Sequence, residues 1–405
     1  MEKKQLLFIP GPVAVSDKVL GAMSRPLIDH RGPEFAALAS SITGRLKPIF
    51  GTERADIILL GSSGTGGLEA AIASAFSPGD RVLAAPVGVF GQRMVAIGRR
   101  FGLEVEVLES QLGARVPPQA LDRALRARTF AGLFLTHNET STGVQNDMAA
   151  LAAIVREHDV LSVVDSVSGM GATRFEMDAW NYDIVVSASQ KVLAAPPGVA
   201  MVAVSARGWK AIERAAAPRF YFDLIEARDF AKLGQTPWTP PVSVLFALEA
   251  ALAHYQDEGA SAVWERHELY ARSIRAAFDA LGMPPFSAAD AHSVTVVASK
   301  IRAGAEPAAL LRKLREERGV VLSGGQGELK GKIVRVGTMG DISQTDVLGA
   351  IGAVEMALLE FGIPVRTGSG VQAALRVFLE RDEARRDGGP RAAGGRAAET
   401  AEASP

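Results

Sequence analysis

Lys191 is the residue whose surroundings best suit covalent chemistry. It follows the apolar run 183–186, which reads as a buried strand, and it precedes the stiff sequence Pro196-Pro197-Gly198. A lysine just past the carboxyl end of a strand lies where open α/β sheets keep their ligands. Apolar neighbours at that place disfavour the ammonium and favour the neutral, nucleophilic amine. An ordinary surface lysine is the alternative, and the neighbouring residues must decide between the two.

An aspartate ends the strand that precedes this one. The segment 160–164 reads as buried strand and leads directly into Asp165. A lysine and a carboxylate are then expected at the same edge of one sheet. Pyridoxal phosphate requires such a pair, because the lysine holds its aldehyde as a Schiff base and the carboxylate keeps the pyridine nitrogen protonated. A single aspartate at a strand end is more often a cap, so the prediction depends on both residues.

Three motifs carry a resemblance to a known family. Ser-Gln-Lys at 189–191, Pro-Pro-Gly at 196–198 and Asp-Ser-Val at 165–167 resemble the class V aminotransferases among the fold-type I pyridoxal phosphate enzymes. Within that family the chain is most similar to the alanine/serine–glyoxylate (or pyruvate) aminotransferases, from about Phe8 to Gly362. The resemblance implies a transaminase that moves an amino group from alanine or serine to glyoxylate or pyruvate with ping-pong kinetics. It also implies a homodimer with shared active sites.

A glycine-rich turn is the candidate phosphate site. The apolar run 57–60 leads into the turn 61–67, and residues 68–72 continue as helix. Free backbone N–H groups at a helix N-terminus can receive a phosphate. The spacing fits neither the Walker loop nor the dinucleotide fingerprint, so the turn alone is weak support. The resemblance implies that the cofactor phosphate is held by Ser63, Gly64 and Thr65.

The resemblance also assigns further cofactor contacts. Phe90, which lies among glycines, would stack on the pyridine, with core packing as the alternative. Thr140, in the polar segment 137–143, would lie beside the phenolic oxygen. The remaining contacts implied are Val167, Gln190, Thr236 and Thr239. The two threonines belong to the proline-rich segment 235–241, which would enter the neighbouring subunit's site, although Thr236 falls where some relatives carry a tyrosine.

Arg335 and Gly11 are the candidate substrate contacts. Arg335 lies in the apolar segment 332–337, where a guanidinium must find an anion or remain in water. Its planar fork suits a carboxylate, and a structural salt bridge is the alternative. The resemblance implies that Arg335 binds the substrate carboxylate. It places Gly11, in the turn Pro10-Gly11-Pro12, near the same group, with a simple turn as the alternative.

The order of elements predicts an α/β protein. Strands alternate with helices at a pitch typical of a mainly parallel sheet, which the resemblance implies is seven-stranded. We expect an N-terminal arm (1–20), a large cofactor-binding domain (21–258) and a smaller α+β domain (259–363). The rest (364–405) is expected to hold the end of a helix and then a disordered tail, because residues from Glu380 onward are charged and rich in alanine and glycine.

Composition excludes several other classes. The net charge of −1 disfavours nucleic acid or an acidic membrane surface as partner, and the absence of cysteine excludes disulfides and the persulfide-forming desulfurases. The six histidines lack close ligand spacing, so no metal site is expected. No apolar run reaches the ~18 residues of a membrane span, and no signal-peptide core is present, so we expect a cytoplasmic enzyme.

Two alternatives remain open at this point. One is a different pyridoxal phosphate reaction at the same site, such as transamination of 2-aminoethylphosphonate or ureidoglycine, or a lyase reaction. The other is a binding protein that retains the fold without catalysis.

Overall fold

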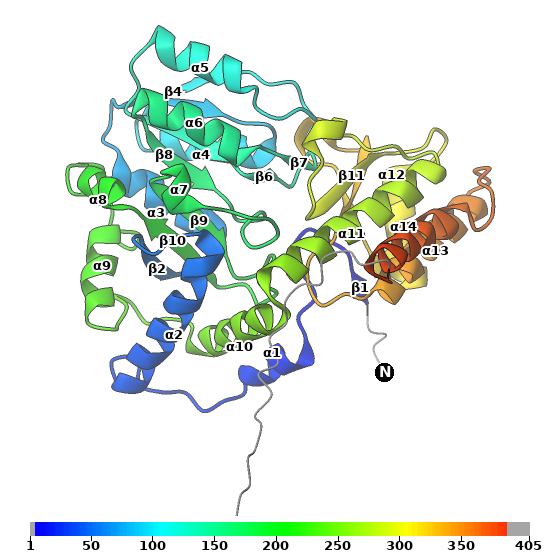
Figure 1. Cartoon of the computed structure of the whole chain (residues 1–405), viewed down its shortest axis with the longest axis horizontal. Coiled ribbons are helices and arrows are strands. Elements are labelled where there is room, and N and C mark those ends of the chain that lie inside the picture. The colour runs from blue at the N-terminus through cyan, green and yellow to red at the C-terminus, as the bar shows by residue number, and fades with distance from the viewer. Residues whose placement is uncertain (1–4, 387–405) are drawn as a thin grey trace, which may run out of the picture.

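A seven-stranded sheet forms the centre of the larger part of the molecule (Figure 1). The computed structural model describes residues 5–386. The strand order is β2-β10-β9-β8-β5-β3-β4, and every neighbouring pair is parallel except those that β10 makes. The strands are β2 (Asp56–Gly61), β3 (Arg81–Ala85), β4 (Glu104–Val107), β5 (Gly132–Thr136), β8 (Leu161–Asp165), β9 (Ile184–Ala188) and β10 (Val199–Val204). The predicted fold class is confirmed.

Helices cover both faces of this sheet, which explains why its central strands are buried along their whole length and mostly apolar. One face packs against α1 (Asp17–Ala22), α2 (Pro33–Phe50), α5 (Pro118–Ala127), α6 (Met148–His158), α7 (Met177–Trp180) and α10 (Val242–Glu258). The other packs against α3 (Gly64–Ala75), α4 (Val89–Arg100), α8 (Ala206–Ile212) and α9 (Leu224–Lys232).

A second, smaller sheet lies beside the first and has its own core (Figure 1). Its antiparallel strands are β11 (Val296–Lys300), β14 (Ile333–Gly337) and β13 (Ser323–Gly324), in that order. The surrounding helices are α11 (Ala260–Ala280), α12 (Pro307–Arg318), α13 (Gln344–Glu360) and α14 (Ser369–Arg386). The N-terminal strand β1 (Leu6–Leu7) pairs with β12 (Val320–Val321), so the chain begins against this smaller part.

The helical region predicted from Val242 to about Leu281 consists of two helices. Gly259 ends α10 and precedes α11 with a φ of +84°, in the region where glycine costs least. The chain passes from the larger to the smaller part at this break. The predicted domain boundaries agree with its position but remain a prediction.

The disorder predicted from Glu380 is wrong for residues 380–386, which continue α14. This helix packs along α11 and buries Ala374 and Phe378. Glutamate, arginine and alanine are good helix formers, so an anchored helix extends through a charged sequence without needing further apolar contacts. The rest of the predicted tail, 387–405, lies outside the described residues. Among the described helices, none is both long and apolar enough to cross a membrane.

Candidate active site

Lys191 and Asp165 meet at the carboxyl edge of the large sheet, as predicted. Asp165 is the last residue of β8, and Lys191 follows the end of the neighbouring strand β9. Asp165 is only 5% exposed, and Lys191 is half-buried. The Lys191 Nζ donates a hydrogen bond to the carbonyl oxygen of Pro10. The turn that contains Pro10 therefore lies against Lys191.

Burial lowers the pKa of Lys191. Loss of solvation lowers its pKa from 10.5 to about 8, with Asp165 opposing that change and the guanidinium groups of Arg335 and Arg93 adding to it. The amine is therefore neutral in mildly alkaline solution. This is the environment that the sequence predicted for a nucleophile.

Asp165 is a carboxylate with few partners. Its Oδ1 accepts one hydrogen bond, 2.9 Å from the backbone nitrogen of Val167. Burial raises its pKa to about 7; Glu139 adds to the rise, while the Val167 N–H, Arg93 and Lys191 oppose it. A protonated ring nitrogen facing Asp165 would supply the positive partner that this buried carboxylate lacks.

Position 11 requires glycine because the backbone there lies close to the Lys191 side chain. Its φ is +106°, and a Cβ built on it would lie 2.7 Å from both Cδ and Nζ of Lys191. A side chain at position 11 would displace the lysine, so the turn serves the site and is more than a change of chain direction.

Part of the candidate phosphate loop is helical. The helix α3 begins at Gly64, within the segment predicted to be a turn, and the Ser63 side chain caps it. A Cβ on Gly67 would lie 2.9 Å from Ala200, so glycine here permits close helix–sheet packing. A Cβ on Gly64 would lie 2.7 Å from Val167. The first turn of α3 and the residues after Asp165 are therefore in contact.

Phe90 lies in the first turn of α4 and is half-buried. The adjacent Gly91 is explained by packing, because a Cβ there would lie 2.7 Å from the Cα of Pro86. The Glu139 Oε2 accepts hydrogen bonds from the backbone nitrogens of Phe90 and Gly91, both at 3.0 Å. This buried carboxylate fixes the start of α4 and hence the position of the ring.

Arg335 projects from β14 toward the large sheet. Its Nε donates to the carbonyl oxygen of Gly324 at 2.8 Å, and its Nη1 donates to that of Thr140 at 3.1 Å. The residue is 4% exposed, and burial lowers its pKa. Within the described chain it forms no ion pair. The alternative of a structural salt bridge is therefore not observed, and the guanidinium retains capacity for an anion.

Two other predicted contacts flank this centre. The Thr140 hydroxyl is buried and donates to the Ser168 hydroxyl at 2.9 Å. The Gln190 Oε1 is buried and has no hydrogen-bond partner among the described residues. An unpaired buried oxygen beside the reactive lysine fits a site that receives a polar ligand.

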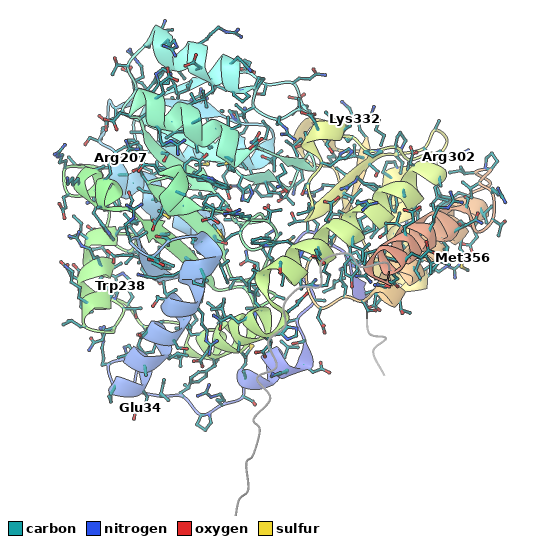
Figure 2. All side chains as sticks on the ribbon, in the orientation of Figure 1. Glu34, Arg207, Trp238, Arg302, Lys332 and Met356 are labelled. Atoms are coloured by element: carbon teal, nitrogen blue, oxygen red, sulfur yellow. The ribbon has the colours of Figure 1, made fainter. Side chains whose placement is uncertain are left out.

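Thr236 and Thr239 are not brought to this centre within one chain. The Thr236 hydroxyl donates to the carbonyl oxygen of Trp238 at 2.8 Å, and Thr239 is exposed. Arg31 holds their loop by donating to the carbonyl oxygens of Thr236 at 2.8 Å and Pro237 at 3.0 Å. Trp238 in the same loop lies at the outer edge of the molecule (Figure 2).

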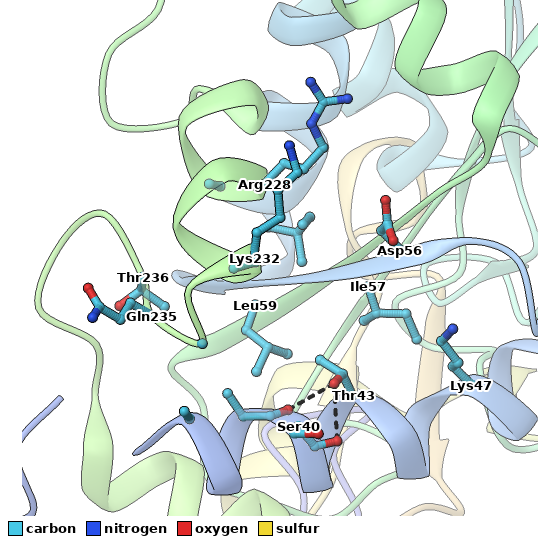
Figure 3. Close-up of a pocket in the computed structure, with 16 residues that line it drawn as sticks. Ser40, Thr43, Lys47, Asp56, Ile57, Leu59, Arg228, Lys232, Gln235 and Thr236 are labelled. Carbon is cyan, nitrogen blue, oxygen red and sulfur yellow. Dashed lines mark hydrogen bonds between the residues drawn. The ribbon is translucent and has the colours of Figure 1, made fainter. Parts of the chain in front are cut away.

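A cavity of about 330 Å³ lies beside this loop, between α2, the edge strand β2 and α9 (Figure 3). Its lining mixes apolar and polar side chains. Arg228 and Lys232 pair there with acidic groups such as Asp229, and Lys47 donates to the carbonyl oxygen of Glu53. None of the predicted active-site residues except Thr236 lines it. The cavity is separate from the lysine centre.

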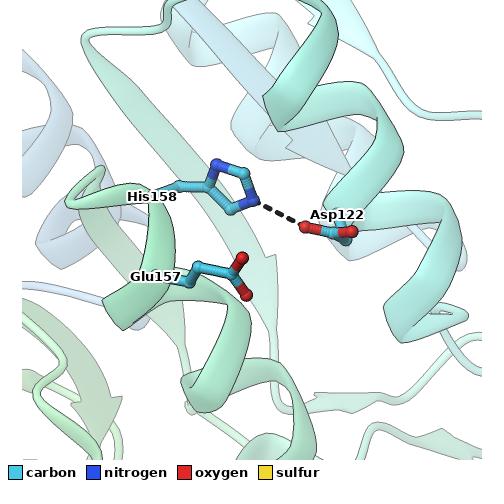
Figure 4. A group of neighbouring side chains, drawn as sticks. All are labelled: Asp122, Glu157 and His158. Carbon is cyan, nitrogen blue, oxygen red and sulfur yellow. Dashed lines mark hydrogen bonds and ion pairs between the residues drawn. The ribbon is translucent and has the colours of Figure 1, made fainter.

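A cluster of Asp122, Glu157 and His158 resembles a metal site in composition (Figure 4). His158 Nε2 lies 2.7 Å from Asp122, and Arg126 pairs with both Asp122 and Glu157. The arginine supplies the positive charge that a metal would otherwise provide, so we interpret the cluster as an ion-pair network on α5 and α6.

Two residues of the site were not singled out from the sequence. Glu139 holds the start of α4, and Arg93 lies over the Phe90 ring and donates to the Thr65 hydroxyl. A helix beginning at Val89 would have placed Arg93 one turn beyond Phe90 on the same face. No comparable pattern indicates Glu139, because the groups that it holds in α4 are backbone nitrogens distant from it in the chain.

Comparisons with known proteins agree with this site. The family model described as Aminotransferase class-V matches residues 16–338. A protein of Anabaena cylindrica named soluble hydrogenase 42 kDa subunit is 38% identical over 93% of this chain and 100% of its own length. The L-aspartate–glyoxylate aminotransferase of Paracoccus denitrificans is 35% identical over 92% of this chain and 96% of its own length.

A solved structure shares most of this architecture. The alanine–glyoxylate aminotransferase of a Nostoc species superposes with a TM-score of 0.85 at 31% identity, over 88% of this chain and 96% of that chain. The predicted cofactor, pyridoxal phosphate, is that of the family. The chain belongs to the class V aminotransferases, within the fold-type I pyridoxal phosphate enzymes.

Proposed function

We propose that this aminotransferase moves the amino group of a small amino acid, alanine or serine, to glyoxylate or pyruvate by a ping-pong mechanism. The observation that carries the proposal is Arg335, a buried guanidinium that has no acidic partner among the described residues and whose charge acts on Lys191. Every donor and acceptor in such a reaction carries a carboxylate, and a bidentate arginine is the side chain best suited to hold one.

The residues of this centre fit the cofactor. Lys191 would bond the aldehyde, Asp165 would face the ring nitrogen, and Phe90 would stack on the ring. The Ser63, Gly64 and Thr65 turn would receive the phosphate at the N-terminus of α3. Thr140, Val167 and Gln190 would complete the contacts. The unpaired Gln190 oxygen and the single hydrogen bond to Asp165 are the features that support this fit.

Pyridoxal phosphate would supply an aldehyde for the donor amine and a ring that accepts electrons from the donor Cα. Arg335 would hold the donor carboxylate, and the turn at Gly11 would close that side of the site. The Lys191 Nζ would be the base that takes the proton from Cα, a role that its lowered pKa favours. Asp165 would stay ionised once a cationic ring nitrogen faces it.

The loop that carries Thr236 and Thr239 supports a dimer. We infer that these hydroxyls reach the phosphate in a second copy of the chain. The exposure of Thr239 and the exposed aromatic side chains of Phe220 and Tyr221 beside the loop agree with a surface that another subunit covers. We likewise propose that the chain has domains at 21–258 and 259–363. We also propose a cytoplasmic location.

The Nostoc and Paracoccus proteins are both named for transfer to glyoxylate, which agrees with the proposed acceptor. The amino donors named for these two proteins differ, so the donor of this chain has to be measured.

This chain has no cysteine to ligate an iron–sulfur cluster. Its residues therefore do not support a hydrogenase function like the one in the name of the Anabaena protein.

The experiment is substitution of Arg335 with methionine and with lysine. We expect Arg335→Met to raise KM for the amino donor roughly 10- to 100-fold, as expected for loss of a charge-assisted pair, while cofactor affinity stays unchanged. Lysine should restore part of the loss. Profiling alanine, serine, aspartate, 2-aminoethylphosphonate and ureidoglycine as donors identifies the substrate.

Arg302 provides the matched control. It also donates to two carbonyl oxygens, those of Leu281 and Pro364, in the smaller part of the molecule (Figure 2). Arg302→Met should affect stability and leave KM unchanged. Equal effects of the two substitutions on KM would contradict the role of Arg335.

A further inference from the structure

Arg93 lies between two residues that the proposed function assigns to opposite ends of the cofactor. Its guanidinium carbon is 4.6 Å from the centre of the Phe90 ring. Its Nη1 donates to the Thr65 hydroxyl at 2.9 Å. Phe90 is the proposed stacking residue, and Thr65 belongs to the proposed phosphate loop.

Arg93 has no other partner in the described chain. Most arginines of this protein that are not fully exposed pair with a carboxylate, as Arg207 does with Asp183 and Arg266 with Glu258. Arg93 instead keeps its charge within the site, where it acts electrostatically on both Lys191 and Asp165. A guanidinium placed in this way is unexplained by packing of α3 against α4 alone.

We infer that Arg93 is a cofactor-positioning residue that joins the ring-stacking phenylalanine to the phosphate-binding threonine. The guanidinium stabilises the Phe90 ring from one face by a cation–π contact, leaving the other face for the pyridine. The same group orients the Thr65 hydroxyl at the N-terminus of α3. Two contacts of one rigid planar group thus fix the distance between ring and phosphate subsites.

This inference rests on the proposed placement of the cofactor and adds a residue to it. The charge of Arg93 also favours the neutral amine of Lys191 and the ionised form of Asp165, the two states in which the cofactor binds. Arg93 touches neither reacting atom in this structure, so its effect is on position and charge.

The test compares Arg93→Met, Arg93→Lys and the control Arg100→Met in full-length protein freed of cofactor. Arg100 is an exposed residue of the same helix. We expect Arg93→Met to weaken binding of pyridoxal phosphate roughly 10- to 100-fold, as expected for a lost hydrogen bond and cation–π contact. It should also reduce the circular dichroism of the bound chromophore. Lysine should recover part of the affinity, and Arg100→Met should bind as the parent does.

Thermal unfolding of the cofactor-free proteins separates positioning from folding. Equal melting temperatures of parent and Arg93→Met, together with weaker binding, support the inference. An unchanged dissociation constant for pyridoxal phosphate in Arg93→Met overturns the inference. A loss of turnover with dicarboxylic amino donors alone would also overturn it, because Arg93 would then be a substrate contact. A parent protein that binds no pyridoxal phosphate would instead overturn the proposed function itself.

Discussion

Two buried aspartates at opposite ends of the central sheet differ in how they are satisfied. Asp183 precedes β9 and accepts hydrogen bonds from Ser162 and a bidentate pair from Arg207, at 2.7 and 2.6 Å. Arg207 lies at the outer edge of the molecule (Figure 2). Asp165 ends β8 and accepts one hydrogen bond, from Val167. The same residue type is thus fully paired at one end and underpaired at the other.

We attribute the difference to two roles, a structural one for Asp183 and the proposed cofactor contact for Asp165. Asp183 joins β8, β9 and α8 by filling its hydrogen-bonding capacity. Asp165 is left with capacity that a cationic ligand can fill, and burial makes its charge costly until that ligand arrives. Two other residues assigned to the same centre, Arg335 and Gln190, also retain hydrogen-bonding capacity that no described residue fills.

Removing the nucleophile is expected to have the largest effect. Lys191→Ala should lower turnover roughly 10⁵-fold or more, because both the covalent attachment and the base are lost. The visible absorbance of bound cofactor should disappear with it. Lys210→Ala, an exposed lysine on α8 near the Asp183 end, is the control and should leave both unchanged. A Lys191→Ala protein with normal activity would refute the site.

Exchanging each aspartate for asparagine tests the comparison directly. Asp183→Asn should destabilise the protein by roughly 2–4 kcal/mol, because a buried bidentate partner of Arg207 is lost, with little change in activity of the folded enzyme. Asp165→Asn should lower activity at least about 100-fold through loss of electrostatic stabilisation. Thermal unfolding and turnover of both variants are the measurements.

The stability of Asp165→Asn has a defined pH dependence. The pKa of Asp165 is raised from 3.8 to about 7, so the folded chain without cofactor holds this proton more tightly than the unfolded chain and loses stability as the pH rises between these two values. The variant should match the parent only below about pH 4, gain on it up to about pH 7, and be the more stable of the two at pH 8. A variant that is less stable than the parent at pH 8 would show that Asp165 is structural, like Asp183.

The affinity for the cofactor should depend on pH through Lys191 and Asp165, with a smaller effect than the substitutions above. Binding requires a neutral Lys191 and an ionised Asp165, whose pKa values are about 8 and about 7. Both conditions improve as the pH rises, so affinity for pyridoxal phosphate should increase between pH 6 and 8.5, by up to about tenfold per unit for each of the two groups that still holds its proton. Titration of the cofactor-free protein at several pH values measures this. A flat profile would contradict the burial of both groups.

The sequence predicted what depends on local pattern. Apolar runs that end in Asp165 and before Lys191 predicted two neighbouring parallel strands, and the register of β8 with β9 confirms this. The glycine cluster predicts a turn over 61–67, yet close packing against the sheet lets Gly64 and Gly67 form part of α3 although glycine is a poor helix former. Here tertiary contact determined the structure, against local propensity.

Contacts between distant segments could not be predicted in this way. Glu139 caps α4, and Arg31 holds the 235–237 loop, through backbone groups that carry no residue identity. The continuation of α14 beyond Glu380 depends on its anchorage to α11, which charge and composition do not report. The roles of Arg335 and Phe90 came from family resemblance, and their geometry became visible only in the folded chain.

The most direct test of the central claim is an absorbance spectrum of the purified protein with pyridoxal phosphate, before and after adding alanine or serine. We expect a visible band from cofactor bound through Lys191, which moves into the near ultraviolet as the donor transfers its amino group. A band that moves only with a different amine would keep the site and change the substrate. No band at all with added cofactor would contradict the assignment of Lys191 and Asp165.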